Sequence, residues 1–254
     1  MKYDILIVGV GGQGVLTLSY ILDNAAMSKG YHFKQSEVHG MAQRGGSVYS
    51  HMRISDRVIF SDIIPEGSAE MLLSLEPLEV MRYIQVLHPE GVVVTSSVPF
   101  KNIPNYPDEA ELLNTLFKLR KIVLINSRYI AAKAQMTRAE NIVLLGAATP
   151  FLPFKLEELS RHVKKVFEGK DQIIEGNILA MRMGYNTGSF YKALLDSDVP
   201  PGVAFKLVSK LDPTTIDPGK ANGFARVLLS RGKECESKLD ALPLDSPTDP
   251  KILD

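Results

Sequence analysis

Short apolar runs alternate with amphipathic stretches over the first half of the chain. The run at residues 4–8 is typical of a buried strand, and apolar positions from Val15 to Ala26 recur at helical spacing. A cluster of glycines lies between them, where we predict a tight turn. The chain therefore begins with a strand, a turn and a helix.

The same alternation continues to about residue 127. Further strands are predicted at residues 32–38, 47–54, 58–60, 91–95 and 121–126. Helices are predicted beyond Pro65, with Pro77 near the helix start and apolar positions out to Leu87, and again at 108–119. This order predicts an α/β fold, a Rossmann-like and mostly parallel sheet flanked by helices.

From about residue 128 the strand pattern stops and helical patterns follow at 130–145, 156–167 and 171–195. We expect residues 1–127, with parts of 128–200, to form the Rossmann-like domain. Residues 128–242 are expected to form a C-terminal helical annex packed on it. Residues 243–254 contain three prolines and predict a flexible tail, disordered or lying over a partner.

The composition is that of a globular protein and argues against nucleic-acid-binding and membrane proteins. The 254 residues are 45% hydrophobic and 23% charged, as in an ordinary globular protein, and the 29 basic and 29 acidic residues cancel. No global positive field is available, so we expect no nucleic-acid partner. The apolar runs are too short for a membrane span or a signal peptide, which predicts a cytoplasmic protein without a membrane partner.

The metal-ligating residue types are sparse. The histidines lack metal-ligand spacing, so no metal site is predicted. The single cysteine, Cys235, makes no internal disulfide and cannot ligate an iron–sulfur cluster alone. It lies between two glutamates in a polar stretch, where we expect it to be exposed.

A glycine-rich motif follows the first predicted strand and opens the first predicted helix. It reads Gly9-Val10-Gly11-Gly12-Gln13-Gly14 and fits the G-x-G-x-x-G template. Such glycines let the backbone approach a ligand, and the helix N-terminus offers N–H donors to a phosphate or carboxylate. Glu37 lies at the distance of a ribose-binding acid. Two interpretations stay open: an anion site, or glycines that only pack the helix on the sheet.

A second polar loop follows the second predicted strand. Its sequence is Ser36-Glu37-Val38-His39-Gly40-Met41-Ala42-Gln43-Arg44-Gly45-Gly46-Ser47. Carboxyl ends of parallel strands share one edge, so this loop and the glycine motif can face one crevice. Arg44 beside Gly45 and Gly46 suits a phosphate or carboxylate, and His39 could handle a proton. Structural roles stay open, with Arg44 clamping Glu37 and His39 making a hydrogen bond.

These two motifs, with the following Ser50-His51-Met52-Arg53-Ile54, resemble the gamma-type domain of 2-oxoacid:ferredoxin oxidoreductases. Within that family the resemblance is to the beta subunits of indolepyruvate ferredoxin oxidoreductase. The specific match covers about the first 60 residues. The resemblance implies a subunit of an enzyme that converts an aryl-2-oxoacid and coenzyme A into an acyl-CoA, releases carbon dioxide and reduces ferredoxin.

The resemblance also implies which subunit of the complex holds each cofactor. Thiamine diphosphate, magnesium and iron–sulfur clusters would belong to a larger catalytic subunit, through which ferredoxin is reduced, and this chain alone would hold no cofactor. Coenzyme A would lie as a substrate at the crevice. The residues expected to bind its anionic groups are Gly9, Gly11, Gly12, Gln13, Gly14, Arg44, Gly45 and Gly46.

Two other functions fit the residues. The chain could be a stand-alone NAD(P)- or FAD-binding Rossmann oxidoreductase built on the glycine motif. It could also be a purely structural subunit whose loops bury against a catalytic partner. No catalytic nucleophile is identified, and His39 is the one candidate for proton transfer near the crevice.

Overall fold

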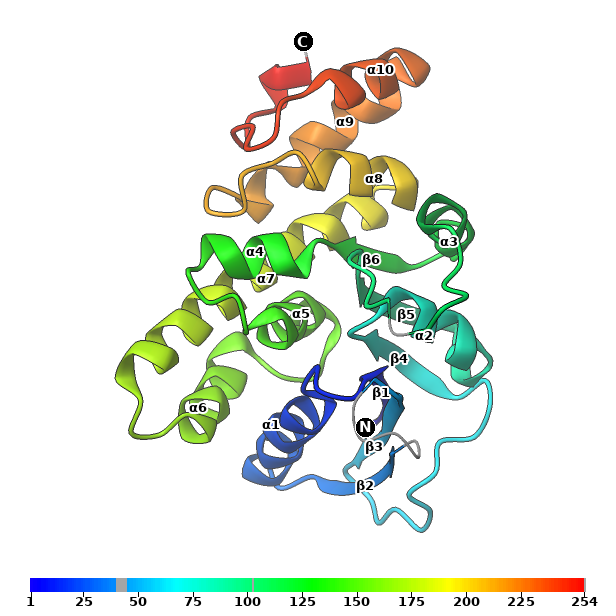
Figure 1. The fold of residues 1–254 in the computed structure, drawn as a ribbon, viewed down its shortest axis with the longest axis vertical. Coiled ribbons are helices and arrows are strands. Elements are labelled where there is room, and N and C mark those ends of the chain that lie inside the picture. The colour runs from blue at the N-terminus through cyan, green and yellow to red at the C-terminus, as the bar shows by residue number, and fades with distance from the viewer. Residues whose placement is uncertain (40–44, 102, 254) are drawn as a thin grey trace.

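A computed structural model describes residues 1–39, 45–101 and 103–253, with the backbone alone at residues 39, 233, 234 and 236. Within these residues the chain forms a six-stranded sheet of order β2-β3-β1-β4-β5-β6 (Figure 1). The strands are β1 (Lys2–Val10), β2 (His32–His39), β3 (Ser47–Ser55), β4 (Ala69–Ser74), β5 (Leu87–Ser96) and β6 (Ile122–Ile125).

Strand direction confirms the mostly parallel sheet with one exception. β1, β4, β5 and β6 pair in parallel, whereas β3 is antiparallel to both of its neighbours, β1 and β2. β3 follows β2 after a short loop, and a short connection returns the chain in the opposite direction. The carboxyl ends of β1 and β2 and the start of β3 therefore meet at one edge of the sheet.

Helices cover both faces of the sheet. Ile5 and Ile7 of β1 belong to a core shared with α1, α5, α6 and α7, whereas Leu6 and Val8 belong to a core shared with α2 and α3. This alternation along one strand assigns the two groups of helices to opposite faces. Their bounds are α1 (Val15–Ser28), α2 (Pro77–Tyr83), α3 (Glu109–Leu116), α4 (Ser127–Lys133), α5 (Glu140–Ala148), α6 (Leu156–Val166) and α7 (Asp171–Asp196).

Two sequence predictions in the region before α2 are wrong. Residues 58–60 form no strand, and Val58 and Phe60 are 62% and 91% exposed. The sequence pattern predicts only helix beyond Pro65, but Ala69–Ser74 form the central strand β4. Its residues Met71, Leu72 and Leu73 are all buried because both faces of the sheet are covered, and such an unbroken apolar run does not alternate.

The helices α5 and α7 approach closely through glycines. A Cβ placed on Gly184 of α7 would overlap the carbonyl oxygen of Val143 and lie 2.9 Å from the Val143 carbonyl carbon. Gly188 faces the Ala147 backbone and Gly146 faces the Met181 backbone in the same way. The absence of side chains at these positions lets the two helix backbones pack against each other.

The residues after α7 form the top of the molecule in Figure 1, where the colour runs from golden yellow through orange to red. They contain α8 (Pro201–Val208), α9 (Ala221–Arg231) and α10 (Lys233–Ala241). α8 packs against β6, and its Phe205 contacts both hydrophobic cores. Since those cores lie on opposite faces, α8 wraps the β6 end of the sheet.

Two expectations about the C-terminal residues differ from the structure. Cys235 is 1% exposed and packs in the core, because α10 turns this position inward between its charged neighbours. The tail does not stand free of the annex. Leu253 is buried, and its carbonyl oxygen accepts hydrogen bonds from Arg231 at 2.7 Å and Lys238 at 3.1 Å.

Candidate anion-binding site

The two glycine-containing loops are joined through their backbones. The Gly11 N–H donates to the Gly46 carbonyl at 2.8 Å, and the Gly45 N–H donates to the Gly11 carbonyl at 3.5 Å. Gly45 has a φ of 79°, in the region that favours glycine. The structure thus brings Gly11, Gly45 and Gly46 together at the predicted edge. Arg44 and the side chain of His39 lie outside the described residues.

The turn into α1 leaves a helix N-terminus open to a ligand. Gly14 occupies the N-cap position with a φ of 91°, and no side chain caps the helix there. The first turn of α1 also lacks acidic residues. Its N–H groups and the positive end of the helix dipole therefore favour an anion. A cavity of about 330 Å³ lies against this turn, lined by residues that include Gly11, Gly12, Gly14 and Thr17.

Gln13 and Gly9 support the turn from within. The Gln13 Oε1 accepts from the Val10 N–H at 2.8 Å, and its Nε2 donates to the Leu75 carbonyl at 3.2 Å. A Cβ on Gly9 would lie 3.0 Å from the Gln13 Oε1 and 3.1 Å from the Leu75 Cβ. The Gln13 side chain thus braces the loop against the end of β4, and Gly9 makes room for it.

Basic side chains from a distant part of the chain complete a second cavity beside the turn. This cavity measures about 440 Å³, and Gly11 and Gly12 line it. Its lining also includes Arg128 of α4, Arg138, which precedes α5, and Glu140 and Asn141 in the first turn of α5. Two permanently charged guanidinium groups therefore share a cavity with the glycine turn, an arrangement suited to phosphate or carboxylate groups.

Arg128 is held in place by a network around Glu140. The Arg128 Nε donates to the Glu140 Oε1 at 3.2 Å, and the Ser127 Oγ donates to the Glu140 Oε2 at 3.3 Å. The Ser127 Oγ also lies 2.8 Å from the Ser96 Oγ at the end of β5. Glu140 thereby links the first turn of α4 to α5 and orients a guanidinium that is still 57% exposed.

Sequence reasoning missed Arg128 and Arg138, which lie far from the glycine motif in the chain. One signal pointed to Arg128. It lies three residues beyond the end of β6, and the carboxyl ends of parallel strands share the edge that carries the glycine turn. Arg138 follows α4 in an irregular connection and had no such signal.

Glu37, the acid at ribose-binding distance, lies on β2 beside α1. It lines a cavity of about 530 Å³ together with Thr17, Tyr20 and Lys165. Close by, the Asp23 carboxyl of α1 is 8% exposed, and its Oδ1 has no hydrogen-bond partner among the described residues. Burial, together with the Glu37 charge, raises the pKa of Asp23 to about 7.

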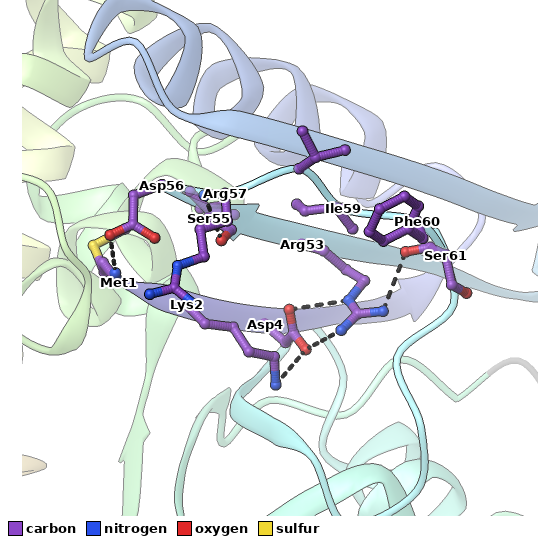
Figure 2. Close-up of a pocket in the computed structure, with 12 residues that line it drawn as sticks. Met1, Lys2, Asp4, Arg53, Ser55, Asp56, Arg57, Ile59, Phe60 and Ser61 are labelled. Carbon is purple, nitrogen blue, oxygen red and sulfur yellow. Dashed lines mark hydrogen bonds and ion pairs between the residues drawn. The ribbon is translucent and has the colours of Figure 1, made fainter.

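A fourth cavity, of about 580 Å³, lies at the opposite edge of the sheet, where Lys2 of β1 pairs with Ser55 of β3. Figure 2 shows Arg53, one of the residues that line it, between Asp4 and Ser61. The guanidinium contacts both carboxylate oxygens of Asp4 at 3.1 Å and donates to the Ser61 carbonyl at 3.1 Å. Lys2 pairs with the same Asp4 at 2.9 Å. The positive charges of Arg53 and Lys2 are paired with Asp4, so they do not form an anion site. Through Ser61, Arg53 instead fixes the loop after β3 to β1.

We expect Arg53→Ala to lower the free energy of unfolding by about 3 kcal/mol, because it leaves the 1% exposed Asp4 carboxylate with the Lys2 charge alone. Urea denaturation measures the loss. The exposed neighbour Arg57 is the control, and Arg57→Ala is expected to change stability by less than about 0.5 kcal/mol. Equal stability of the two variants would contradict the stabilising role of the Arg53–Asp4 ion pair.

Neither a metal site nor a membrane span is found in the part of the chain that the structure describes. Its side chains contain no group of three or more His, Cys, Asp or Glu placed to hold a metal ion. Among the same residues, each helix is too short or too polar to cross a membrane.

The fold and the site define an α/β protein whose sheet carries a glycine turn and two arginines at the carboxyl edge. The sequence pattern of the family described as pyruvate ferredoxin/flavodoxin oxidoreductase matches residues 4–187. The chain belongs to this family.

Curated relatives agree with this assignment. The chain is 37% identical over 197 residues to the indolepyruvate oxidoreductase subunit IorB of Archaeoglobus fulgidus, covering 73% of this chain and 95% of the relative. It is also 37% identical over 198 residues to the subunit of the same name from Methanothermobacter thermautotrophicus, covering 74% and 99%. The chain is therefore a member of an oxidoreductase complex, which implies a catalytic partner subunit.

Solved structures share the fold. The pyruvate oxidoreductase subunit PORC of Thermotoga maritima superposes with a TM-score of 0.57 at 20% identity, covering 72% of this chain and 95% of that one. The gamma subunit of a keto/oxoacid ferredoxin oxidoreductase from Geobacter sulfurreducens gives a TM-score of 0.56 at 24% identity, covering 73% and 95%.

Proposed function

We propose that this chain is the subunit without thiamine diphosphate in a 2-oxoacid:ferredoxin oxidoreductase that acts on an aryl pyruvate such as indolepyruvate. The complex would form an acyl-CoA, release carbon dioxide and reduce ferredoxin. The names of the relatives that are 37% identical support the choice of oxoacid. The chain's part in this reaction would be to hold coenzyme A at the edge of the sheet.

The observation that carries this proposal is the cavity shared by the glycine turn and two arginines. Coenzyme A has a pyrophosphate and a ribose phosphate, and both need donors and positive charge. Gly11, Gly12, Arg128 and Arg138 all line this cavity. Glu140 lines it too and pairs with Arg128 at 3.2 Å, so Arg138 adds a second positive charge beside that ion pair. Charge-assisted hydrogen bonds of this kind are about twice as strong as neutral ones.

The other cofactors of such a reaction do not fit this chain. Its sequence contains one cysteine, which cannot ligate an iron–sulfur cluster alone. It also lacks a Gly-Asp-Gly motif for thiamine diphosphate and magnesium. We place these groups, and the contact with ferredoxin, in the larger partner subunit.

The chemistry of this chain would be positioning. Holding the pantetheine arm by its anionic end fixes where the thiol can reach, and this raises the effective concentration of the thiol at the partner's reacting centre. Glu140 contributes by orienting Arg128. No covalent step is assigned to a residue of this chain.

Removal of one guanidinium tests the proposal in the assembled complex. Arg128→Ala is expected to raise the KM for coenzyme A about tenfold while kcat changes less than twofold, because the lost hydrogen bond to a charged group holds the carrier and not the reacting atoms. Steady-state kinetics measure both constants. Arg226→Ala, at an exposed position on α9, is the matched control and should leave the KM unchanged.

The alternative of a purely structural subunit predicts a different result. Under it, Arg128→Ala or Arg44→Ala would reduce recovery of the complex and leave the KM for coenzyme A of the remaining complex unchanged. An unchanged KM in both variants would overturn the proposed role of this edge. A stand-alone dinucleotide oxidoreductase is less well supported, because the curated relatives are subunits.

A further inference from the structure

The C-terminal segment of the chain lies outside the family match and contacts the candidate site's supporting helix. The match ends at residue 187, so α8, α9, α10 and the tail follow it. The tail contacts α4, the helix that carries Arg128. The contact is made by Asp245, 112 residues from its ion-pair partner Lys133.

Asp245 binds two side chains of α4. Its Oδ2 lies 2.8 Å from the Lys133 Nζ, and its Oδ1 accepts a hydrogen bond from the Tyr129 hydroxyl. The Lys133 ammonium, followed by the Tyr129 hydroxyl, holds the pKa of Asp245 below its ordinary value. Asp212 lies 4.0 Å from the same Lys133 Nζ. Two acidic residues of the C-terminal segment therefore converge on the last turn of α4.

The backbone around Asp245 is fixed in place. Asp245 has a φ of 64°, a left-handed conformation that aspartate adopts more readily than most residues. The next residue, Ser246, donates from its N–H to the Lys210 carbonyl at 2.9 Å and accepts at its carbonyl from the Asp212 N–H at 2.9 Å. The carboxylate is thus presented from an anchored turn.

Helix α4 needs such external support. It has 7 residues, which is too short for a helix that is stable by its own hydrogen bonds. Its first turn is held by the Asn126 cap, which accepts from the Tyr129 N–H at 2.9 Å, and by Glu140. Asp245 binds Lys133 at the other end of the helix, five residues from Arg128, and also Tyr129, the residue next to Arg128.

We propose that Asp245 is a positioning residue that fixes α4 through Lys133 and Tyr129 and so keeps the Arg128 guanidinium at the cavity beside the glycine turn. This inference rests on the proposed function, since the readout is coenzyme A binding at that cavity. The inference gives the C-terminal segment a role in ligand binding. Asp245, which has this role, lies beyond residues 4–187, the part of the chain that matches the family.

A double-mutant cycle in the assembled complex tests it. Asp245→Asn keeps the size and tolerates the left-handed backbone but removes the charge. It is expected to raise the KM for coenzyme A about threefold with kcat unchanged, and to add nothing in an Arg128→Ala background. Lys133→Gln removes the same ion pair from the α4 side and should give the same result. Asp240→Asn, which breaks the exposed Lys206 pair in the same segment, is the control.

The outcomes separate this inference from the proposed function. If Arg128→Ala and Arg44→Ala both leave the KM unchanged, the proposed function fails. If Arg128→Ala alone leaves the KM unchanged, the positioning role of Asp245 fails. If Arg128→Ala raises the KM but Asp245→Asn and Lys133→Gln do not, the positioning role fails alone. The role also fails if Asp245→Asn raises the KM equally with and without Arg128, because the effect then does not act through that guanidinium.

Discussion

Gly184→Ala is expected to lower the free energy of unfolding by about 3 kcal/mol or more. The added Cβ would overlap the carbonyl oxygen of Val143, which is helix backbone and cannot move aside without separating α5 from α7. Overpacking of a core costs about 1–3 kcal/mol when side chains can adjust, and here the obstacle is backbone. Urea denaturation of the full chain, followed by circular dichroism, measures the change.

Gly176→Ala provides the matched control on the same helix. A Cβ at Gly176 would meet the terminal methyl of Met136, the far end of a flexible side chain. Alanine also favours a helix over glycine by up to about 1 kcal/mol, which offsets the adjustment. We expect this variant to lie within about 1 kcal/mol of the wild type. A similar loss in both variants would show that the close approach of α5 and α7 is not the cause.

Asp23→Asn is expected to stabilise the protein at pH 8 by up to about 4 kcal/mol and to have little effect near pH 4. The pKa of Asp23 is about 7 in the folded chain, against 3.8 for an ordinary aspartate. Between these values the folded state keeps a proton that the unfolded state has lost, so stability falls as the pH rises. The upper limit is this difference of about 3 pKa units at about 1.4 kcal/mol each.

The measurement is the free energy of unfolding of both proteins from pH 4 to 8.5. The difference should grow up to about pH 7 and then level off. Asp198→Asn, at an exposed position with a left-handed backbone, is the control. Its free energy of unfolding should change with pH in the same way as that of the wild type. A constant difference for Asp23→Asn across the range would show that the carboxyl titrates normally.

Local patterns were enough to predict the first strand, turn and helix. An apolar run, a glycine cluster and helical spacing coincide there, and β1 and α1 match the prediction to within two residues. Pro77 also marks the start of α2, as its missing N–H suggested. In these places the side chains that define the element are neighbours in sequence.

The loop at residues 58–60 and strand β4 could not be predicted in this way, because their burial depends on distant parts of the chain. Val58 and Phe60 have strand-forming side chains, yet they lie exposed on a loop held by Arg53 and Lys34 through its backbone. Met71, Leu72 and Leu73 of β4 are consecutive buried apolar residues because helices cover both faces of the sheet, so this run lacks the alternation that marks a strand. Whether a segment is covered by helices from elsewhere in the chain cannot be predicted from the residues of that segment alone.

The candidate site was predictable in part for the same reason. The meeting of Gly11 with Gly45 and Gly46 follows from strand order, because the ends of β1 and β2 share an edge. Arg138 enters the cavity only through the packing of α4 and α5 on the sheet. No spacing rule links a glycine motif to an arginine so far along the chain.

The position of α8 also limits how the sheet could be extended by another polypeptide. An outermost strand normally offers its unpaired N–H and C=O groups as a template for a new strand. Phe205 and its helix wrap the β6 side, so that template is blocked there. Strand addition would therefore have one direction, outward from β2, the strand whose loop leads into the glycine-lined edge.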